Sequence, residues 1–281
     1  MKRGIALGLL LLLAGCCSTG DPVKRAEARL RREVETAGGF RQVRAAEALG
    51  PTADFPIDSP EPQTRIGQYR VRIAAGRREY EEILRRKALD SSLPEQCHAL
   101  ESAAKLAVSF APEERETLWK IVHGANSLAA GYALWLLAAN GDAEAGRLLT
   151  VALESGGPHQ LTCAYACGFL PGLTVRREAA LRRLMEQEAP DSLKGAFAMW
   201  ALARQRRLST DVLLRRLRNL SAETPEQVLR FHLEALGEAG GGAEIPLLAG
   251  YLDDSRPEIA NAAAGAVLRI ARRGGTADSV E

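Results

Sequence analysis

Residues 243–273 read AEIPLLAGYLDDSRPEIANAAAGAVLRIARR, and this stretch decides the fold. It predicts two short helices, each apolar on one face, that meet at an acidic turn at 253–257. Neither helix can bury its apolar face alone, so each needs neighbours of the same kind. Counting back from Leu247 in steps of 33 residues reaches Leu214, Leu181 and Leu148. The stretch therefore predicts one unit of a helical repeat.

The same pattern extends towards the N-terminus, with joints rich in Gly, Pro, Asn and Asp, such as Asn140-Gly141-Asp142. One apolar column at this spacing contains Leu136, Phe169, Leu202, Ala235 and Leu268. The predicted helices cover about 77–89, 93–110, 112–123, 128–139, 143–153, 159–170, 176–187, 193–204, 210–220, 225–238, 243–252 and 257–272. We therefore predict an all-α fold over 77–273, a right-handed α-solenoid of antiparallel helix pairs with a period of about 33 residues.

The last unit resembles the HEAT repeat, particularly the short bacterial type first described in phycobilin lyases. The resemblance rests on the Leu-rich first helix, Asp253-Asp254 in the turn, Pro257 opening the second helix and the Ala-rich run to Leu268. The basic residue usual near the start of the second helix is missing from 259–261. A tetratricopeptide array has a similar period, but its aromatic signature is not met in 143–153 or 176–187. The pattern favours a HEAT-like superhelix.

The N-terminus MKRGIALGLLLLLAGCCSTG has two basic residues, a short apolar run and then small residues, which is typical of a secretory signal. Leu13-Ala14-Gly15-Cys16 resembles the lipobox of bacterial lipoproteins, in which the cysteine is acylated and the preceding peptide, here 1–15, is removed. The alternative is an ordinary cleaved signal with an incidental cysteine. Cys17 and Ser18 follow rather than aspartate, which by analogy favours a periplasm-facing lipoprotein of the outer membrane.

Residues 16–76 are predicted to tether the solenoid to the membrane. The part from 22 to 49 is charged and helix-prone with a break at Gly38-Gly39, and 50–64 contains four prolines. Residues 68–75 alternate too briefly for a strand and are interpreted as the lead-in to the first solenoid helix. The last residues, 274–281, are predicted to be a disordered tail.

Charge excludes one class of partner and suggests another. The chain has 37 Lys and Arg against 35 Asp and Glu, and removal of Lys2 and Arg3 with the signal makes the two counts equal, so nucleic acid is not expected as a partner. Residues 176–218 carry eleven basic and five acidic groups, whereas 223–258 carry two basic and eight acidic ones. This polarity indicates either a binding face or charges that compensate across neighbouring repeats.

The sequence offers no set of catalytic residues, metal ligands or cofactor contacts. Cys163 and Cys167 lie one helical turn apart, and Cys97 lies two periods earlier, which is consistent with a thiol site for metal or redox chemistry. The other interpretation is that they are small apolar core residues, because Cys163 falls in a column of alanines and leucines. We favour the core interpretation.

These observations predict a lipoprotein, acylated at Cys16, whose solenoid is a non-enzymatic scaffold for another protein of the cell envelope. The second helix of each pair lines the concave face of such a solenoid. The candidate contact residues there are Arg204, Arg230, Glu234 and Glu238. The alternatives are a lyase-like or other enzyme on a HEAT scaffold, as the resemblance implies, and a thiol or metal module that uses Cys163 and Cys167.

Overall fold

The computed structural model describes residues 20–52 and 54–275. Over these ranges the chain forms fifteen α-helices and two short 3-10 helices, and it has no strand. The predicted all-α solenoid is confirmed as a sequential array of packed helices; its handedness, its 33-residue period and its HEAT character stay predictions. The predicted signal peptide, Cys16 and residues 276–281 of the predicted tail lie outside the described residues.

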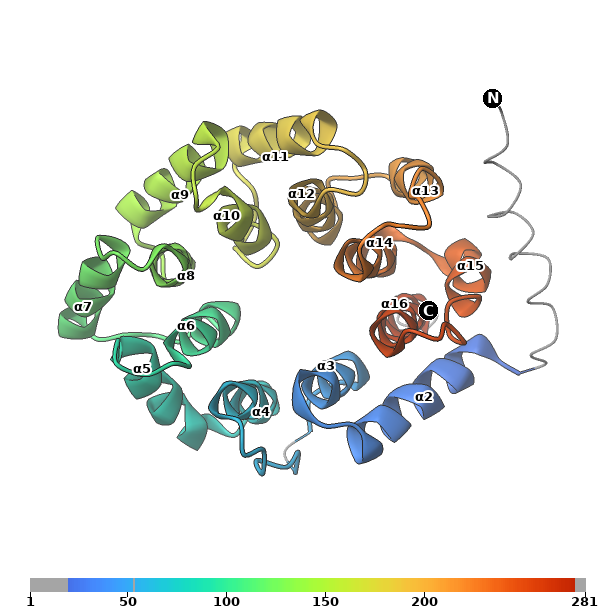
Figure 1. Ribbon diagram of the computed structural model, residues 1–281, viewed down its shortest axis with the longest axis horizontal. Coiled ribbons are helices and arrows are strands. Elements are labelled where there is room, and N and C mark those ends of the chain that lie inside the picture. Colours follow the sequence, from blue (N-terminus) through green and yellow to red (C-terminus); the bar gives the residue numbers. More distant parts are fainter. Residues whose placement is uncertain (1–19, 53, 276–281) are drawn as a thin grey trace, which may run out of the picture.

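The helices form two concentric layers around a central axis (Figure 1). The inner layer contains α3 (Gly39–Leu49), α4 (Pro62–Ala74), α6 (Gln96–Lys105), α8 (Ser127–Ala139), α10 (Gln160–Ala166), α12 (Leu193–Arg204), α14 (Glu226–Ala239) and α16 (Pro257–Gly275). The outer layer contains α2 (Pro22–Thr36), α5 (Glu81–Leu89), α7 (Pro112–Val122), α9 (Ala143–Ser155), α11 (Val175–Gln187), α13 (Thr210–Arg218) and α15 (Ile245–Ala249). The 3-10 helices η1 (Arg78–Tyr80) and η2 (Gly242–Glu244) lead into α5 and α15. Each inner helix packs against the next, and α16 packs against α3, so the array closes into a ring.

Local sequence explains where the helices begin. Asp21, Asn126 and Asp142 cap α2, α8 and α9 by accepting hydrogen bonds from the first free backbone amides. Pro22 occupies the first turn of α2, where the missing amide hydrogen is not needed. Gly141, with φ of +82°, makes the tight turn between α8 and α9. The helix ranges were predicted from these same polar and Gly or Pro residues at the joints, and most predicted helices therefore agree with the structure.

Side chains tie the carboxyl ends of neighbouring inner helices together. Asn140, just after α8, donates to the Val108 carbonyl beyond α6 at 3.0 Å, and Gln205 donates to the Leu170 carbonyl beyond α10 at 2.8 Å. Arg273 of α16 donates to the Gly240 carbonyl beyond α14 at 2.7 Å. These bonds satisfy carbonyls that a helix end leaves without partners. Because neighbouring ends meet, the inner helices run in the same direction around the ring.

The ring closes where α2 and α3 meet α15 and α16, a joint that we call the seam. Ala26 and Leu30 of α2 are fully buried in the main core. Arg25 pairs with Asp253 and Arg44 with Glu258, each at 2.6 Å. At the other end of the seam, Arg272 of α16 donates to the Ala48 carbonyl at 3.2 Å. The last turn of α16 therefore holds both of its neighbours.

This closure differs from the predicted tether at 16–76, because α2, α3 and α4 are part of the ring rather than a stalk before it. The apolar stripe of α2, from Val23 to Val34, is narrow, and the alternating charges around it conceal it in the sequence. Several of those charges bind α15 and α16 instead of water; Arg29, for example, donates to Asn261 at 3.0 Å.

The Pro-rich segment also differs from the predicted linker. Phe55 is only 2% exposed and packs with Val43, Ala46 and Val71 of α3 and α4 in a small second core. The described residues of this segment, 50–52 and 54–61, thus lie between two inner helices, α3 and α4, that have no outer helix between them in the chain, whereas every later pair of successive inner helices has one. The predicted lead-in at 68–75 lies within α4, which begins earlier because Pro62 is well placed in its first turn.

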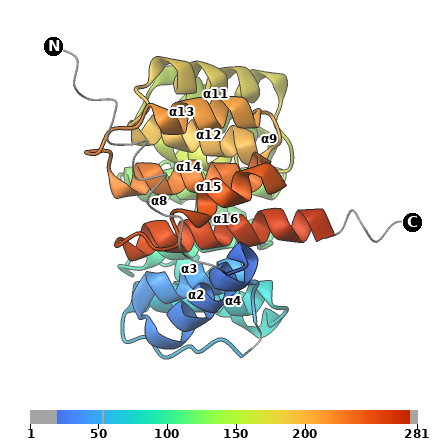
Figure 2. The same ribbon diagram turned by 90° about the vertical axis from the view of Figure 1, so that its right-hand side faces the viewer.

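Helix α16 is narrow enough to fit between two neighbours because its contacting residues are small. A Cβ added at Gly237 of α14 would lie 2.7 Å from the Cα of Ala266, and one added at Gly265 would lie 3.1 Å from the Cβ of Ala48. Figure 2 shows α16 running through the depth of the ring, with its last turn projecting beyond the other helices. Among the described helices, none is long and apolar enough to cross a bilayer.

Candidate functional site: the inner face of the ring

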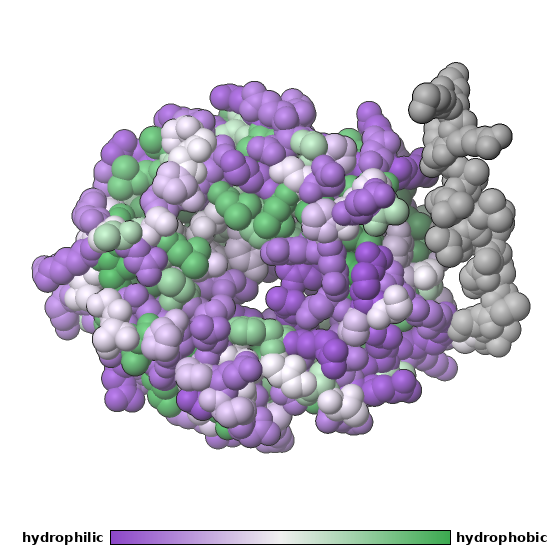
Figure 3. All heavy atoms as spheres, viewed as in Figure 1, coloured by the Kyte–Doolittle hydropathy of each residue, from purple (hydrophilic) through white to green (hydrophobic). Residues whose placement is uncertain are grey.

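The concave side of the array surrounds an opening through the centre of the molecule (Figure 3). All four predicted contact residues lie on adjacent inner helices, Arg204 on α12 and the other three on α14. Arg230, Glu234 and Glu238 follow at intervals of four residues, which places them in one row along α14. Arg204 Nη1 lies 3.0 Å from Glu238 Oε1, and Arg230 Nε lies 3.7 Å from Glu234 Oε1. The structure brings these residues together, and their role in binding stays a prediction.

Aromatic side chains from three helices form the surface beside this row. We call Tyr165, Phe169, Phe197, Trp200 and Phe231 the aromatic wall. Tyr165 stacks on Trp200 with ring centroids 5.1 Å apart, and Phe197 lies 4.5 Å from Phe231. Tyr165 of α10 also lies 6.0 Å from Phe231 of α14, although α12 packs between those two helices. Such a contact is possible on the concave side, where the helices converge. The aromatic wall therefore lies on that side, with Tyr165 and Phe169 partly exposed and its other three members buried.

Three cations rest on the aromatic wall at cation–π distances. Lys105 Nζ lies 5.2 Å from the ring centroid of Tyr165. Arg204 Cζ lies 4.7 Å from that of Phe169, and Arg230 Cζ lies 4.7 Å from that of Phe231. Positively charged groups therefore lie over the faces of three rings of the aromatic wall.

Two of these cations have close carboxylate partners. Glu101 lies 2.7 Å from Lys105, and Glu238 lies 3.0 Å from Arg204. Burial acts to raise the pKa of Glu101, but the positive charges of Lys105 and Arg70 outweigh burial and keep the pKa below its ordinary value. Glu101 and Lys105 are thus both charged at neutral pH, and each of the two cations has a carboxylate that balances its charge.

A further ion pair joins α3 and α4. Arg70 is 7% exposed; its Nε lies 2.5 Å from Glu47 Oε1, and its Nη1 donates to Ser102 Oγ at 2.8 Å. Burial opposes ionisation of Glu47, but the charge and the hydrogen bond of Arg70, together with the charge of Lys105, outweigh burial and lower the pKa of that carboxyl. Because Arg70 also lowers the pKa of Glu101, the two ion pairs form one network across α3, α4 and α6.

The thiols are held in an unreactive state. Cys163 and Cys167 are buried, and burial raises the pKa of Cys167 to about 12 and that of Cys163 further. Burial also raises the pKa of the half-buried Cys97. A thiol that stays protonated is a poor nucleophile and a poor metal ligand. Within residues 20–52 and 54–275, no three His, Cys, Asp or Glu side chains are grouped to hold a metal ion.

The charge polarity seen in the sequence is partly compensated between elements. The acidic turn of the last unit meets the arginines of α2 and α3 at the seam. In the basic region, Arg176 pairs with Glu154 and Arg182 with Glu178, whereas Arg183, Arg215 and Arg218 are exposed on the outer layer. Compensation between elements, one of the two interpretations of this polarity, thus accounts for part of it, and exposed basic groups remain on the outer layer.

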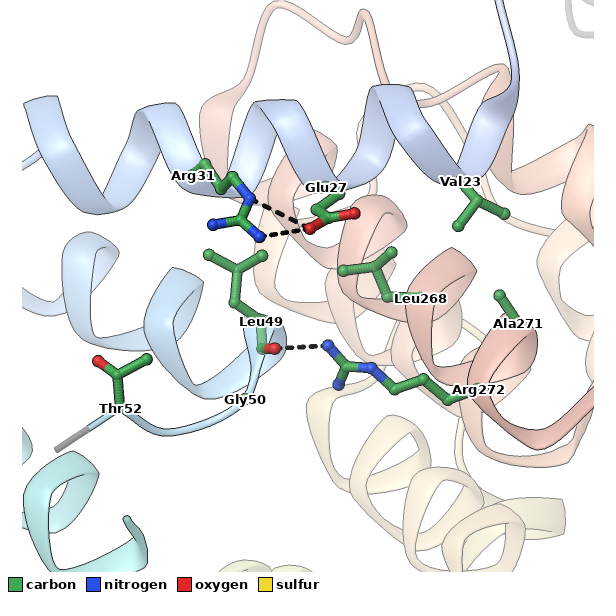
Figure 4. Close-up of a pocket in the computed structure, with 9 residues that line it drawn as sticks. All are labelled: Val23, Glu27, Arg31, Leu49, Gly50, Thr52, Leu268, Ala271 and Arg272. Carbon is green, nitrogen blue, oxygen red and sulfur yellow. Dashed lines mark hydrogen bonds and ion pairs between the residues drawn. The ribbon is translucent and has the colours of Figure 1, made fainter. Parts of the chain in front are cut away.

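The seam also contains a cavity of about 410 Å³ between α2, α16 and the end of α3 (Figure 4). Leu49, Leu268 and Ala271 form its apolar part. Its polar rim consists of the Glu27–Arg31 ion pair and the guanidinium of Arg272, which donates to the Leu49 carbonyl. This cavity lies away from the aromatic wall.

Sequence reasoning missed the aromatic wall and the charges around Arg70. In the sequence, Phe169 and Trp200 appear only as members of apolar core columns. The sequence pattern also assigns α3 and α4 to the predicted tether, so the charges around Arg70 are not expected in the solenoid. One signal was present: aromatics make up 5% of the chain, yet five of them fall in the second helices of three successive predicted pairs, between 165 and 231. Comparisons with protein-family models, with curated proteins and with solved structures find no match to this chain.

Proposed function

We propose that this chain is a bacterial lipoprotein, anchored through acylated Cys16, that binds a segment of another envelope protein within its ring and does not catalyse a reaction. The HEAT-like resemblance and the lipobox support the class of protein. The predicted location is the periplasmic side of the outer membrane. The observation that carries the binding role is the row on α14 beside the aromatic wall, because aromatic and arginine side chains dominate the binding energy of protein interfaces.

Ring closure defines what kind of partner fits. The concave face of an open solenoid can hold a folded domain, whereas here the same face surrounds a central opening (Figure 3). A partner must therefore insert a narrow segment, such as an extended peptide, to reach Arg204 and Arg230.

The ring also lies closer to the membrane than a tether of residues 16–76 would place it. Pro22, the first residue of α2, is six positions after Cys16 in the sequence. With α2 in the ring, an acyl anchor at Cys16 holds the ring next to the bilayer rather than at the end of a long tether. The partner is then itself at or near the membrane surface.

The test is site-specific photo-crosslinking in intact cells. A benzophenone amino acid replaces Phe169, a partly exposed member of the aromatic wall, or Val175, which is 88% exposed on the outer layer. Mass spectrometry should identify a protein adduct from position 169 that position 175 does not give. Labelling with a palmitate analogue should mark the wild-type chain and not a Cys16→Ser variant. Absence of any adduct from position 169 above background contradicts the binding role.

A further inference from the structure

Arg230 differs from the other two cations on the aromatic wall. Lys105 and Arg204 each have a carboxylate at 2.7 Å and 3.0 Å, respectively. The nearest carboxylate to Arg230 is Glu234, whose Oε1 lies 3.7 Å from Nε, beyond hydrogen-bond distance. Within the described residues, Arg230 Nε is enclosed by protein and has no hydrogen-bond partner.

This arrangement is unfavourable for the protein alone. The Arg230 side chain is 13% exposed, and a guanidinium keeps its charge and five N–H donors at any physiological pH. Buried charged groups in proteins are usually paired and hydrogen-bonded, because loss of water without a new partner is costly. Phe231 supports the flat face of the guanidinium at 4.7 Å, which leaves its edge to form hydrogen bonds.

We propose that Arg230 is the anchor for a carboxylate carried by the inserted peptide segment, next to an apolar side chain that packs on the aromatic wall. A carboxylate can accept two parallel hydrogen bonds from the two Nη groups of one guanidinium, and this contact does not need the enclosed Nε of Arg230. Tyr165 and Phe169 are the partly exposed members of the aromatic wall and offer the apolar contact. The surrounding charges agree: Glu238 serves both Arg204 and Arg269, so these two arginines and Arg230 are three cations beside only two carboxylates, Glu234 and Glu238.

This inference rests on the proposed function and specifies its ligand chemistry as an acidic peptide with neighbouring apolar residues. The probes are two peptides, acetylated and amidated at their ends, with the sequences Leu-Asp-Phe-Asp-Leu and Leu-Asn-Phe-Asn-Leu. They have nearly the same shape and differ in charge. Binding to the full chain in mild detergent is measured by calorimetry.

The wild-type chain should bind the acidic peptide at least about tenfold more tightly than the amide peptide, as expected for a well-formed charged hydrogen-bond pair. Arg230→Gln should bring the ratio of the two affinities close to one. Arg183→Gln, which removes an exposed arginine from the outer layer, should leave the ratio unchanged. Glu234→Gln removes the nearest competing carboxylate and should tighten binding of the acidic peptide about threefold, a gain that misfolding cannot produce.

Equal affinity of the wild-type chain for the two peptides overturns the inference, and so does an unchanged ratio in Arg230→Gln. If glucuronic acid binds in an Arg230-dependent manner while neither peptide binds, the site is for a sugar acid and the peptide assignment is wrong. The crosslinking result separates this inference from the proposed function. An adduct from position 169 together with no preference for the acidic peptide refutes the carboxylate anchor alone.

Discussion

At the scale of single residues, Gly168 is where the aromatic wall leaves no room for a side chain. A Cβ at this position would lie 2.3 Å from Cζ3 of the buried Trp200 ring. Gly168→Ala must therefore displace the ring, and we expect it to lower the free energy of unfolding by about 1–3 kcal/mol. Urea denaturation measures this change. Gly242→Ala, where nothing lies within 4 Å, is the control, and an equal effect at both positions contradicts the prediction.

His232 on α14 gives the fold a defined response to acid. It is 1% exposed, its Nδ1 lies 2.9 Å from the Val228 carbonyl, and burial, reinforced by the charge of Arg216, lowers its pKa to about 4. The histidine of the unfolded chain binds a proton near pH 6.5, whereas that of the folded chain does so only near pH 4. The contribution of neutral His232 to the free energy of unfolding is therefore full above pH 6.5 and is lost as the pH falls towards 4. The loss should be on the order of 3 kcal/mol.

The measurement compares the free energy of unfolding across pH 4–7 in the wild type and in His232→Gln. The variant should lose less stability on acidification, because it has no imidazole to protonate. His123→Gln, at an exposed position, should follow the wild-type curve. Identical curves for His232→Gln and the wild type would show that other groups cause the acid sensitivity.

At the scale of secondary-structure elements, Phe55 anchors the connection between α3 and α4, the two successive inner helices that have no outer helix between them in the chain. Phe55→Ala removes a side chain that is 2% exposed and leaves a cavity between α3 and α4. We expect a loss of about 3–5 kcal/mol in the free energy of unfolding. Hydrogen exchange should increase in α3 and α4 before it increases in α10. Thr52→Ala, exposed in the same segment, should have little effect, and unchanged exchange in Phe55→Ala would contradict the anchoring role.

Helix positions could be predicted from the sequence because the signals for them are local. The predicted range 193–204 agrees with α12 at both ends, and the break at Gly38-Gly39 separates α2 from α3. The burial of Phe55 could not be predicted in the same way. It depends on α3 and α4 standing side by side, and the four prolines of residues 50–64 are also typical of an exposed linker.

At the scale of the whole molecule, the site and the closure depend on contacts between residues far apart in the sequence. The position of Arg204 and Glu238 on the concave face could be predicted from the repeat alone, because the second helix of each pair lines that face. The aromatic wall could not, because a buried and a lumen-facing aromatic have the same pattern in a helix. The pairing of Arg25 with Asp253 joins the two ends of the array, and no periodicity within the array specifies it.

Ring closure can be tested directly with an engineered disulfide across the seam. Ala48 and Gly265 are 217 positions apart in the sequence, yet a Cβ at position 265 lies 3.1 Å from that of Ala48. This separation is slightly below the 3.5–4.5 Å that a disulfide needs, so a small shift of α16 suffices. In an open solenoid the same two positions would lie at opposite ends of the array.

The double variant Ala48→Cys/Gly265→Cys should form an intramolecular disulfide under mild oxidation, seen as faster migration on a non-reducing gel. Closing so long a loop should also raise the free energy of unfolding by up to about 5 kcal/mol, an increase that reductant abolishes. The buried Cys163 and Cys167 should stay reduced, because their raised pKa values keep them protonated. The pair Ala48→Cys/Val175→Cys should give no internal bond, since α11 does not pack against α3. If the seam pair gives only crosslinks between molecules, the ring is open in solution and a folded domain could reach the aromatic wall from the side.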